Sequence, residues 1–232
     1  MNDTPSGPGA SDLFEIYFSP SEVYERRREG KFGLPLIVFA VASLILFFVT
    51  KDLLRPVMDA EWRVASQAMM EQNPQLTADQ VGAMRSMGEK FALVVVAFYS
   101  VLGPLLAGLV LWIVAKFVGL KPTLPVAITI AVFALFPMLI EYVVSAAQSF
   151  VVPEEAITSR YSLSLGPARF MDGAAPMARA VVGHLDVFTV WTAFLMFIGL
   201  KVITRATNAQ AATAAGVVWL VGLLPPILSA MR

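Results

Sequence analysis

Residues 34–50 read LPLIVFAVASLILFFVT and contain no charged side chain. A helix rises about 1.5 Å per residue, so a run of this length covers most of the roughly 30 Å of hydrocarbon in a bilayer. An open strand is excluded inside lipid, because each unpaired backbone group there costs several kcal/mol. This stretch therefore predicts a helix that crosses a membrane.

Four further apolar stretches follow, at residues 91–115, 124–149, 185–204 and 211–230. The composition agrees, since 57% of the residues are hydrophobic and 15% are charged. Soluble domains average about 45–50% apolar residues and about 25% charged residues. The predicted fold class is an all-α integral membrane protein, a bundle of five transmembrane helices with amphipathic interfacial helices. We place all five spans in one membrane domain, residues 34–230.

The chain before the first span divides into a tail and a leader. Residues 1–12 are rich in Gly, Ser and Pro, and we predict that they are disordered because they cannot bury apolar area. Residues 13–33 are predicted to form an N-terminal interfacial helix. Ser19 can cap it, and Pro20 falls at the first helical position, where proline is favoured.

Two longer polar excursions separate the spans. Apolar residues recur at helical spacing over residues 53–69, which predicts an amphipathic helix at the bilayer interface. Thr77 and Gln80 form a capping-box pattern, and the helix that it starts is predicted to run directly into the second span. Residues 151–183 contain several glycines and prolines, which predict an irregular loop.

Prolines and glycines inside the spans have predictable effects. Pro104 and Pro137 are predicted to break the second and third spans, because proline lacks a backbone N–H and its ring displaces the carbonyl four residues before it. Glycines in the spans are predicted to let helices approach closely, as in ordinary membrane packing. They are Gly103, Gly108, Gly199, Gly216 and Gly222.

Basic residues predict the orientation. They occur in the leader (Arg26, Arg27, Arg28, Lys31) and in the two short loops (Lys116, Lys121, Lys201, Arg205). With five spans these segments share one side, and the positive-inside rule makes that side the cytoplasm. We predict a cytoplasmic N-terminus and an outer C-terminus. The three consecutive arginines are predicted to face the lipid headgroups, either binding anionic lipid or serving only as a topology signal, and we favour the signal.

Glu141, His184 and Asp186 are the candidate polar site. Glu141 lies within the third span, and the other two begin the fourth. One imidazole and two carboxylates could hold a divalent cation, or could lock two helices through hydrogen bonds. We expect neither a metal nor a catalytic residue here. The favoured interpretation is that Glu141 either reaches the outer headgroups or is simply protonated by desolvation. Asp186 is then expected to stabilise the positive end of its helix.

Phe188 and Trp191 lie three residues apart on one helical face. They could form a surface for lipid headgroups or a partner protein. The favoured interpretation is an interfacial aromatic belt.

Several stretches resemble the YIP-domain family, named for proteins that bind Ypt/Rab GTPases. They are YFSPSEVYE at residues 17–25, SLSLG at 162–166, LDVFTVW at 185–191, and the later Gly199-Leu200 pair. The motif residues are Phe18, Pro20, Asp186, Phe188, Trp191 and Gly199. The resemblance implies a five-helix membrane domain with a cytoplasmic N-terminus, and in eukaryotes a role in vesicle traffic. The short leader favours the bacterial branch and an inner (cell) membrane over a eukaryotic endomembrane, and argues against a GTPase partner.

The remaining composition narrows the function. The chain has no Cys, a single His and zero net charge, so thiol chemistry and paired imidazoles are excluded and no basic face predicts nucleic acid. No phosphate loop or nucleophile elbow is present, and we expect no cofactor. We predict a non-enzymatic scaffold or membrane-organising factor, whose partners are membrane lipids, another membrane protein or a second copy. The alternatives are a small transporter subunit with a polar site at Glu141, and an outer-face metal-dependent enzyme.

Overall fold

The computed structural model describes residues 9–231, and these form helices and connecting loops without any strand. The helices α1 to α7 are Asp12–Glu15, Pro20–Arg26, Gly33–Thr50, Arg55–Gln72, Ala78–Phe117, Leu124–Ala134 and Pro137–Gln148. Three short 3₁₀ turns follow, η1 (Glu154–Ala156), η2 (Arg160–Leu163) and η3 (Pro167–Phe170). The last helices are α8 (Pro176–Gly183), α9 (Val187–Thr204), α10 (Asn208–Val221) and α11 (Leu224–Ala230).

Five helical segments of the described chain are long and apolar enough to cross a membrane. They are Gly33–Thr50, Ala78–Phe117, Leu124–Gln148, Val187–Thr204 and Asn208–Ala230. The predicted fold class, an all-α protein with five membrane spans, is confirmed.

The leader differs from the single interfacial helix predicted over residues 13–33. It forms two short helices, α1 and α2, with Pro20 at the start of the second. Ser19 precedes α2 without a side-chain capping bond. The tail predicted to be disordered over 1–12 extends too far, because Asp12 begins α1 and is fully buried. Residues 1–8 lie outside the described residues.

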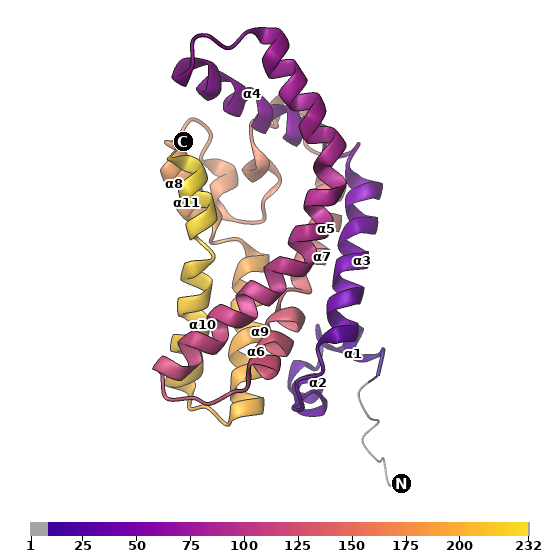
Figure 1. Cartoon of the computed structure of the whole chain (residues 1–232), viewed down its shortest axis with the longest axis vertical. Helices are drawn as coiled ribbons and strands as arrows, with labels where there is room; N and C mark the ends of the chain where they lie inside the picture. The colour runs from indigo at the N-terminus through magenta and orange to yellow at the C-terminus, as the bar shows by residue number, and fades with distance from the viewer. Residues whose placement is uncertain (1–8, 232) are drawn as a thin grey trace. The chain divides into compact units, whose positions relative to one another are not determined.

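The second span belongs to one helix of 40 residues, α5. Helix α4 comes before it in the chain and lies beside the first part of α5 in Figure 1. The predicted capping box is confirmed, since the Thr77 amide donates to Gln80 Oε1 at 2.9 Å and the Gln80 amide donates to Thr77 Oγ1 at 3.3 Å. The predicted break at Pro104 is wrong, because α5 continues through it. A membrane helix tolerates proline where its surroundings satisfy the freed carbonyl.

The third span is interrupted where Pro137 predicts it. Helix α6 ends at Ala134 and α7 begins at Pro137. Proline offers no N–H to the carbonyl of Phe133, which instead accepts a hydrogen bond from the Phe136 amide at 3.2 Å. Every residue from Val126 to Ala134 is buried, so α6 forms the centre of a core.

The described chain divides into two compact units. The first contains the leader up to Val41, residues 100–139 and residues 188–222, and its core surrounds α6. The second contains residues 42–99, 140–187 and the chain from Leu223 onward. Within the second unit α8 packs against α11 and η3, and η2 packs against α4 and η3.

Candidate functional site

The leader is held in the first unit by two tyrosines that reach backbone carbonyls. Tyr24 is fully buried and donates its hydroxyl to the Ile130 carbonyl at 3.3 Å. Tyr17 donates to the Phe136 carbonyl at 3.0 Å, at the interruption between α6 and α7. Burial raises the pKa of Tyr17 to about 12, so this hydroxyl stays protonated and remains a donor.

Two motifs far apart in the sequence meet at Tyr24. Gly199 of α9 has no side chain, and a Cβ built there would lie 3.0 Å from Tyr24 Cζ and 2.8 Å from Ile130 Cγ2. A larger residue would meet both side chains and push α9 away from the leader and α6. The leader motif and the Gly-Leu pair of the fourth span therefore serve one packing contact, and Gly199 makes the close approach predicted for it.

The aromatic residues of the fourth-span motif face inward. Phe188 is 4% exposed, and Trp191 packs edge-on to Tyr17 with ring centroids 5.8 Å apart. The leader covers Trp191 through Tyr17, and Phe188 is buried, so the interfacial aromatic belt favoured from the sequence stays a prediction that the inward packing of this pair does not support. Phe18, by contrast, is 86% exposed and is the outward aromatic of the leader motif.

The predicted lipid-facing arginines include a buried ion pair. Arg27 Nε lies 2.7 Å from Asp12 Oδ2, and both side chains are almost fully buried. Arg26 Nη2 lies 2.6 Å from the other oxygen of the same carboxylate, Asp12 Oδ1. The Arg27 guanidinium also sits 5.6 Å from the ring centre of Phe133. Arg27 thus faces the protein core and not the lipid, because Asp12 is a buried charge that needs cations.

Arg28 alone of the three arginines is substantially exposed. Its guanidinium donates to the Val202 carbonyl at 3.2 Å and lies 2.5 Å from a Glu25 oxygen. A cation is favourable at this place, since α9 ends at Thr204 and its last carbonyls carry partial negative charge.

Two further motif strings meet in the second unit. Ser164 donates its hydroxyl to Asp186 Oδ2 at 2.6 Å, and the Gly166 amide donates to Ser164 Oγ at 2.9 Å. Asp186 is 4% exposed and directly precedes α9. The SLSLG loop is therefore fastened to the start of the fourth span by a charge-assisted hydrogen bond.

The structure places the predicted polar site as follows. Glu141 and Asp186 are close enough for their charges to interact. His184 is half-buried and ends α8. Across residues 9–231, no three His, Cys, Asp or Glu side chains are arranged so that they could hold one metal ion.

Sequence reasoning did not find the ion pair that joins the two polar excursions. The Glu61 carboxylate of α4 accepts hydrogen bonds from the Arg160 amide at 2.9 Å and from Arg160 Nη2 at 2.7 Å. Burial alone would raise the pKa of Glu61, but the hydrogen bonds from Arg160 outweigh it and lower the pKa below its ordinary value. No sequence signal pairs these residues, which stand 99 positions apart.

We predict that Glu61→Gln loosens η2 from α4. The pair is partly exposed and screened by solvent, so we expect a loss of about 1 kcal/mol or less. A carboxyl with a lowered folded-state pKa stabilises above its unfolded pKa of about 4.3 and loses that contribution as pH falls through the folded value. Hydrogen exchange of the η2 amides should therefore speed up in the wild type on acidification, and in the variant already at pH 7.

The matched control is Glu155→Gln, an exposed acid of the same loop that makes no ion pair in the described part of the chain. It should leave the exchange of η2 unchanged. Equal exchange in Glu61→Gln and wild type at neutral pH would show that this ion pair does not hold the loop.

Taken together, five apolar helices and a leader buried against them define a multi-pass membrane protein built by helix packing. The family model of the Yip1 domain matches residues 14–229, and the chain belongs to the Yip1-domain family. The family resemblance carried by the motif strings is thereby confirmed. Neither the curated proteins nor the solved structures contain a match to this chain.

Proposed function

We propose that this protein is a non-enzymatic membrane scaffold that organises a bacterial inner membrane through lipid or protein contacts. The observation that supports it is how the family-motif residues are used. Tyr24 and Gly199 join the leader to the spans, and Ser164 joins the outer loop to Asp186. Motif residues that pack the fold together are what we expect of a protein that acts through its surface and not through a catalytic site.

Affinity purification in a mild detergent tests the scaffold role. The wild-type protein, tagged at its C-terminus, should bring down a stoichiometric membrane-protein partner, a second copy of itself or a retained lipid, as native mass spectrometry would resolve. Repeated recovery of the bare monomer, stripped of lipid as well as protein, would overturn the proposal.

The proposed orientation has a cytoplasmic N-terminus and an outer C-terminus, and the Cys-free sequence allows a direct test. Ser21 of the leader and Gln75 of the first excursion are both exposed. We predict that a membrane-impermeant maleimide labels Gln75→Cys on intact spheroplasts and labels Ser21→Cys only after permeabilisation. The reverse pattern would invert the topology.

A second candidate function, a small transporter subunit, is favoured by the interrupted third span with Glu141 one turn beyond Pro137. Broken helices often line substrate sites in transporters. Ion or substrate flux in proteoliposomes should then fall in Glu141→Gln. Equal flux in the variant, the wild type and empty vesicles would remove this candidate.

A further inference from the structure

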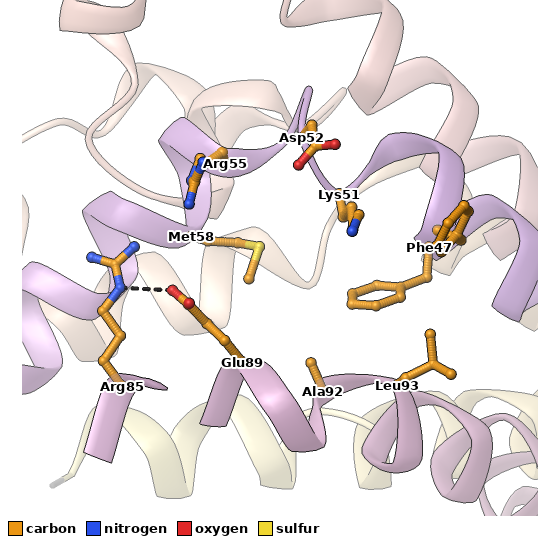
Figure 2. A pocket seen from close by; sticks show the side chains of 10 residues that line it. Phe47, Lys51, Asp52, Arg55, Met58, Arg85, Glu89, Ala92 and Leu93 are labelled. Carbon is orange, nitrogen blue, oxygen red and sulfur yellow. Dashed lines mark hydrogen bonds and ion pairs between the residues drawn. The ribbon is translucent and has the colours of Figure 1, made fainter. Parts of the chain in front are cut away.

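A small open cavity of about 240 Å³ lies where the end of α3, the start of α4 and the first half of α5 come together. Helix α3 contributes Phe47, the turn after it contributes Lys51, and α4 contributes Arg55. Helix α5 contributes Glu89 and Leu93. Figure 2 shows Lys51 and Arg55 on one side of the space and Glu89 and Leu93 on the other. All of these residues belong to the second unit.

The lining of the cavity changes from charged to apolar along α5. Its lining passes along α5 from the charged Arg85 and Glu89 to Ala92 and Leu93, where the apolar run of the second span begins. Along α5, Leu93 lies eight positions after Arg85, a rise of about 12 Å. The headgroup layer on each side of a bilayer is roughly 5–8 Å thick. In a bilayer whose hydrocarbon begins at Ala92, a lining of this length would reach from the headgroup layer into the first part of the acyl chains.

Two cations of the lining remain available to an anion. Arg85 is already paired, with Asp59 on α4 and with Glu89, whose Oε1 lies 2.9 Å from Arg85 Nε. Lys51 and Arg55 form no ion pair with any residue that the structure describes. Lys51 Nζ instead lies 5.0 Å from the ring centre of Phe48. Lysine and arginine at a headgroup layer are well suited to a phosphodiester.

The lining also contains carboxylates, and these select among phospholipids. Asp52 follows Lys51 in the lining, and Glu89 stands across the cavity with one oxygen bonded to Arg85. The negative charges of Asp52 and Glu89 would repel a headgroup that carries only negative charge. A headgroup with a phosphate and a primary ammonium suits both signs of charge, since the ammonium has three N–H donors for carboxylate oxygens.

The size of the cavity favours a headgroup over a whole ligand. Pockets for drug-sized molecules measure about 300–1,000 Å³, and this one is smaller. Acyl chains would continue outside it along lipid-facing side chains. Phe48 is 63% exposed and Leu93 is 49% exposed, so such a surface adjoins the cavity.

We propose that the cavity between α3, α4 and α5 binds the phosphoethanolamine headgroup of a phosphatidylethanolamine. The phosphate lies between Lys51 and Arg55, the ammonium faces Glu89, and the acyl chains leave past Phe47 and Leu93. The inference deepens the proposed function by naming the lipid that the scaffold holds, and it rests on the protein residing in a bilayer.

Native mass spectrometry of the full chain in detergent tests the proposal, with phosphatidylethanolamine, phosphatidylcholine and phosphatidylglycerol added separately. Phosphatidylcholine carries the same phosphate without N–H donors, and phosphatidylglycerol carries no ammonium. We expect phosphatidylethanolamine to bind most tightly. Lys51→Gln/Arg55→Gln should weaken that binding about tenfold or more, as the loss of charged hydrogen bonds does. Equal binding by the double variant and wild type would overturn the proposal.

Two matched variants sharpen the test. Lys90→Gln removes an exposed cation of α5 that lies beside the cavity but outside its lining, and should leave lipid binding unchanged. Glu89→Gln should abolish the preference for phosphatidylethanolamine over phosphatidylcholine. This single variant tests the proposal independently, should the double variant fail to fold. A preference that survives in Glu89→Gln, tighter binding of phosphatidylglycerol, or full displacement of the lipid by inorganic phosphate would each overturn the assignment.

Failure of this inference is separable from failure of the scaffold role. The scaffold role is judged on the wild-type protein, by whether any partner or lipid is recovered with it. The cavity is judged by differences among variants and among lipids. A wild type that retains a protein partner while the variants bind every lipid equally would keep the scaffold proposal and remove this one.

Discussion

Asp12→Ala is expected to release the leader from the first unit. The variant leaves Arg27 buried without its carboxylate partner, and breaking a buried ion pair from one side costs about 3–5 kcal/mol. Arg26 keeps Glu15 and Glu22 as partners, so the loss falls mainly on Arg27. The midpoint of thermal unfolding in detergent should fall, and trypsin should cleave after Arg27, which is protected in the wild type.

The matched control lies in the same leader. Glu29 and Lys31 form an exposed ion pair at 2.5 Å, with both side chains largely in solvent. Glu29→Gln removes one charge of that pair and should change neither the unfolding midpoint nor the tryptic pattern. If Asp12→Ala behaves like Glu29→Gln, the buried pair contributes nothing to docking the leader.

Gly108→Ala is expected to separate α5 from α6. A Cβ at this position would lie 2.5 Å from Ile128 Cα, a backbone atom that no rotamer change can move. Overpacking of this kind costs about 1–3 kcal/mol. The variant should unfold at a lower temperature than the wild type, as measured by tryptophan fluorescence during thermal unfolding.

Gly103→Ala on the same helix is the control, because a Cβ there meets no atom within 4 Å. Alanine is the better helix former by up to about 1 kcal/mol, so this variant should be neutral or slightly stabilised. Equal unfolding midpoints for the two alanine variants would show that α5 can shift away from α6 without loss.

The spans could be predicted from the sequence because the bilayer imposes one requirement on every segment. A stretch such as residues 34–50 can be recognised as a membrane span without knowledge of its contacts, because its apolar length is sufficient evidence. The interruption at Pro137 followed from the same local chemistry, whereas Pro104 leaves α5 unbroken. The effect of a proline depends on what surrounds the freed carbonyl, and the local sequence does not contain that information.

The contacts of the candidate sites could be predicted far less well. Arg27 lies in a run of three basic residues that reads as a surface signal, while its partner Asp12 lies in a stretch that reads as a disordered tail. The pairing of Glu61 with Arg160 likewise joins two excursions that no periodicity connects. Small-residue positions were recognisable, but only the structure separates the tight Gly108 from the open Gly103.

The docked leader also constrains the order in which the chain can assemble during synthesis. Its bonds run to Ile130, Phe136 and Val202, which lie 106, 119 and 174 positions after their leader partners Tyr24, Tyr17 and Arg28. At about 5–20 residues per second, a ribosome needs on the order of ten seconds or more to reach the last of them. The leader is thus synthesised well before its partners, and it can complete its docking only after the fourth span has been made.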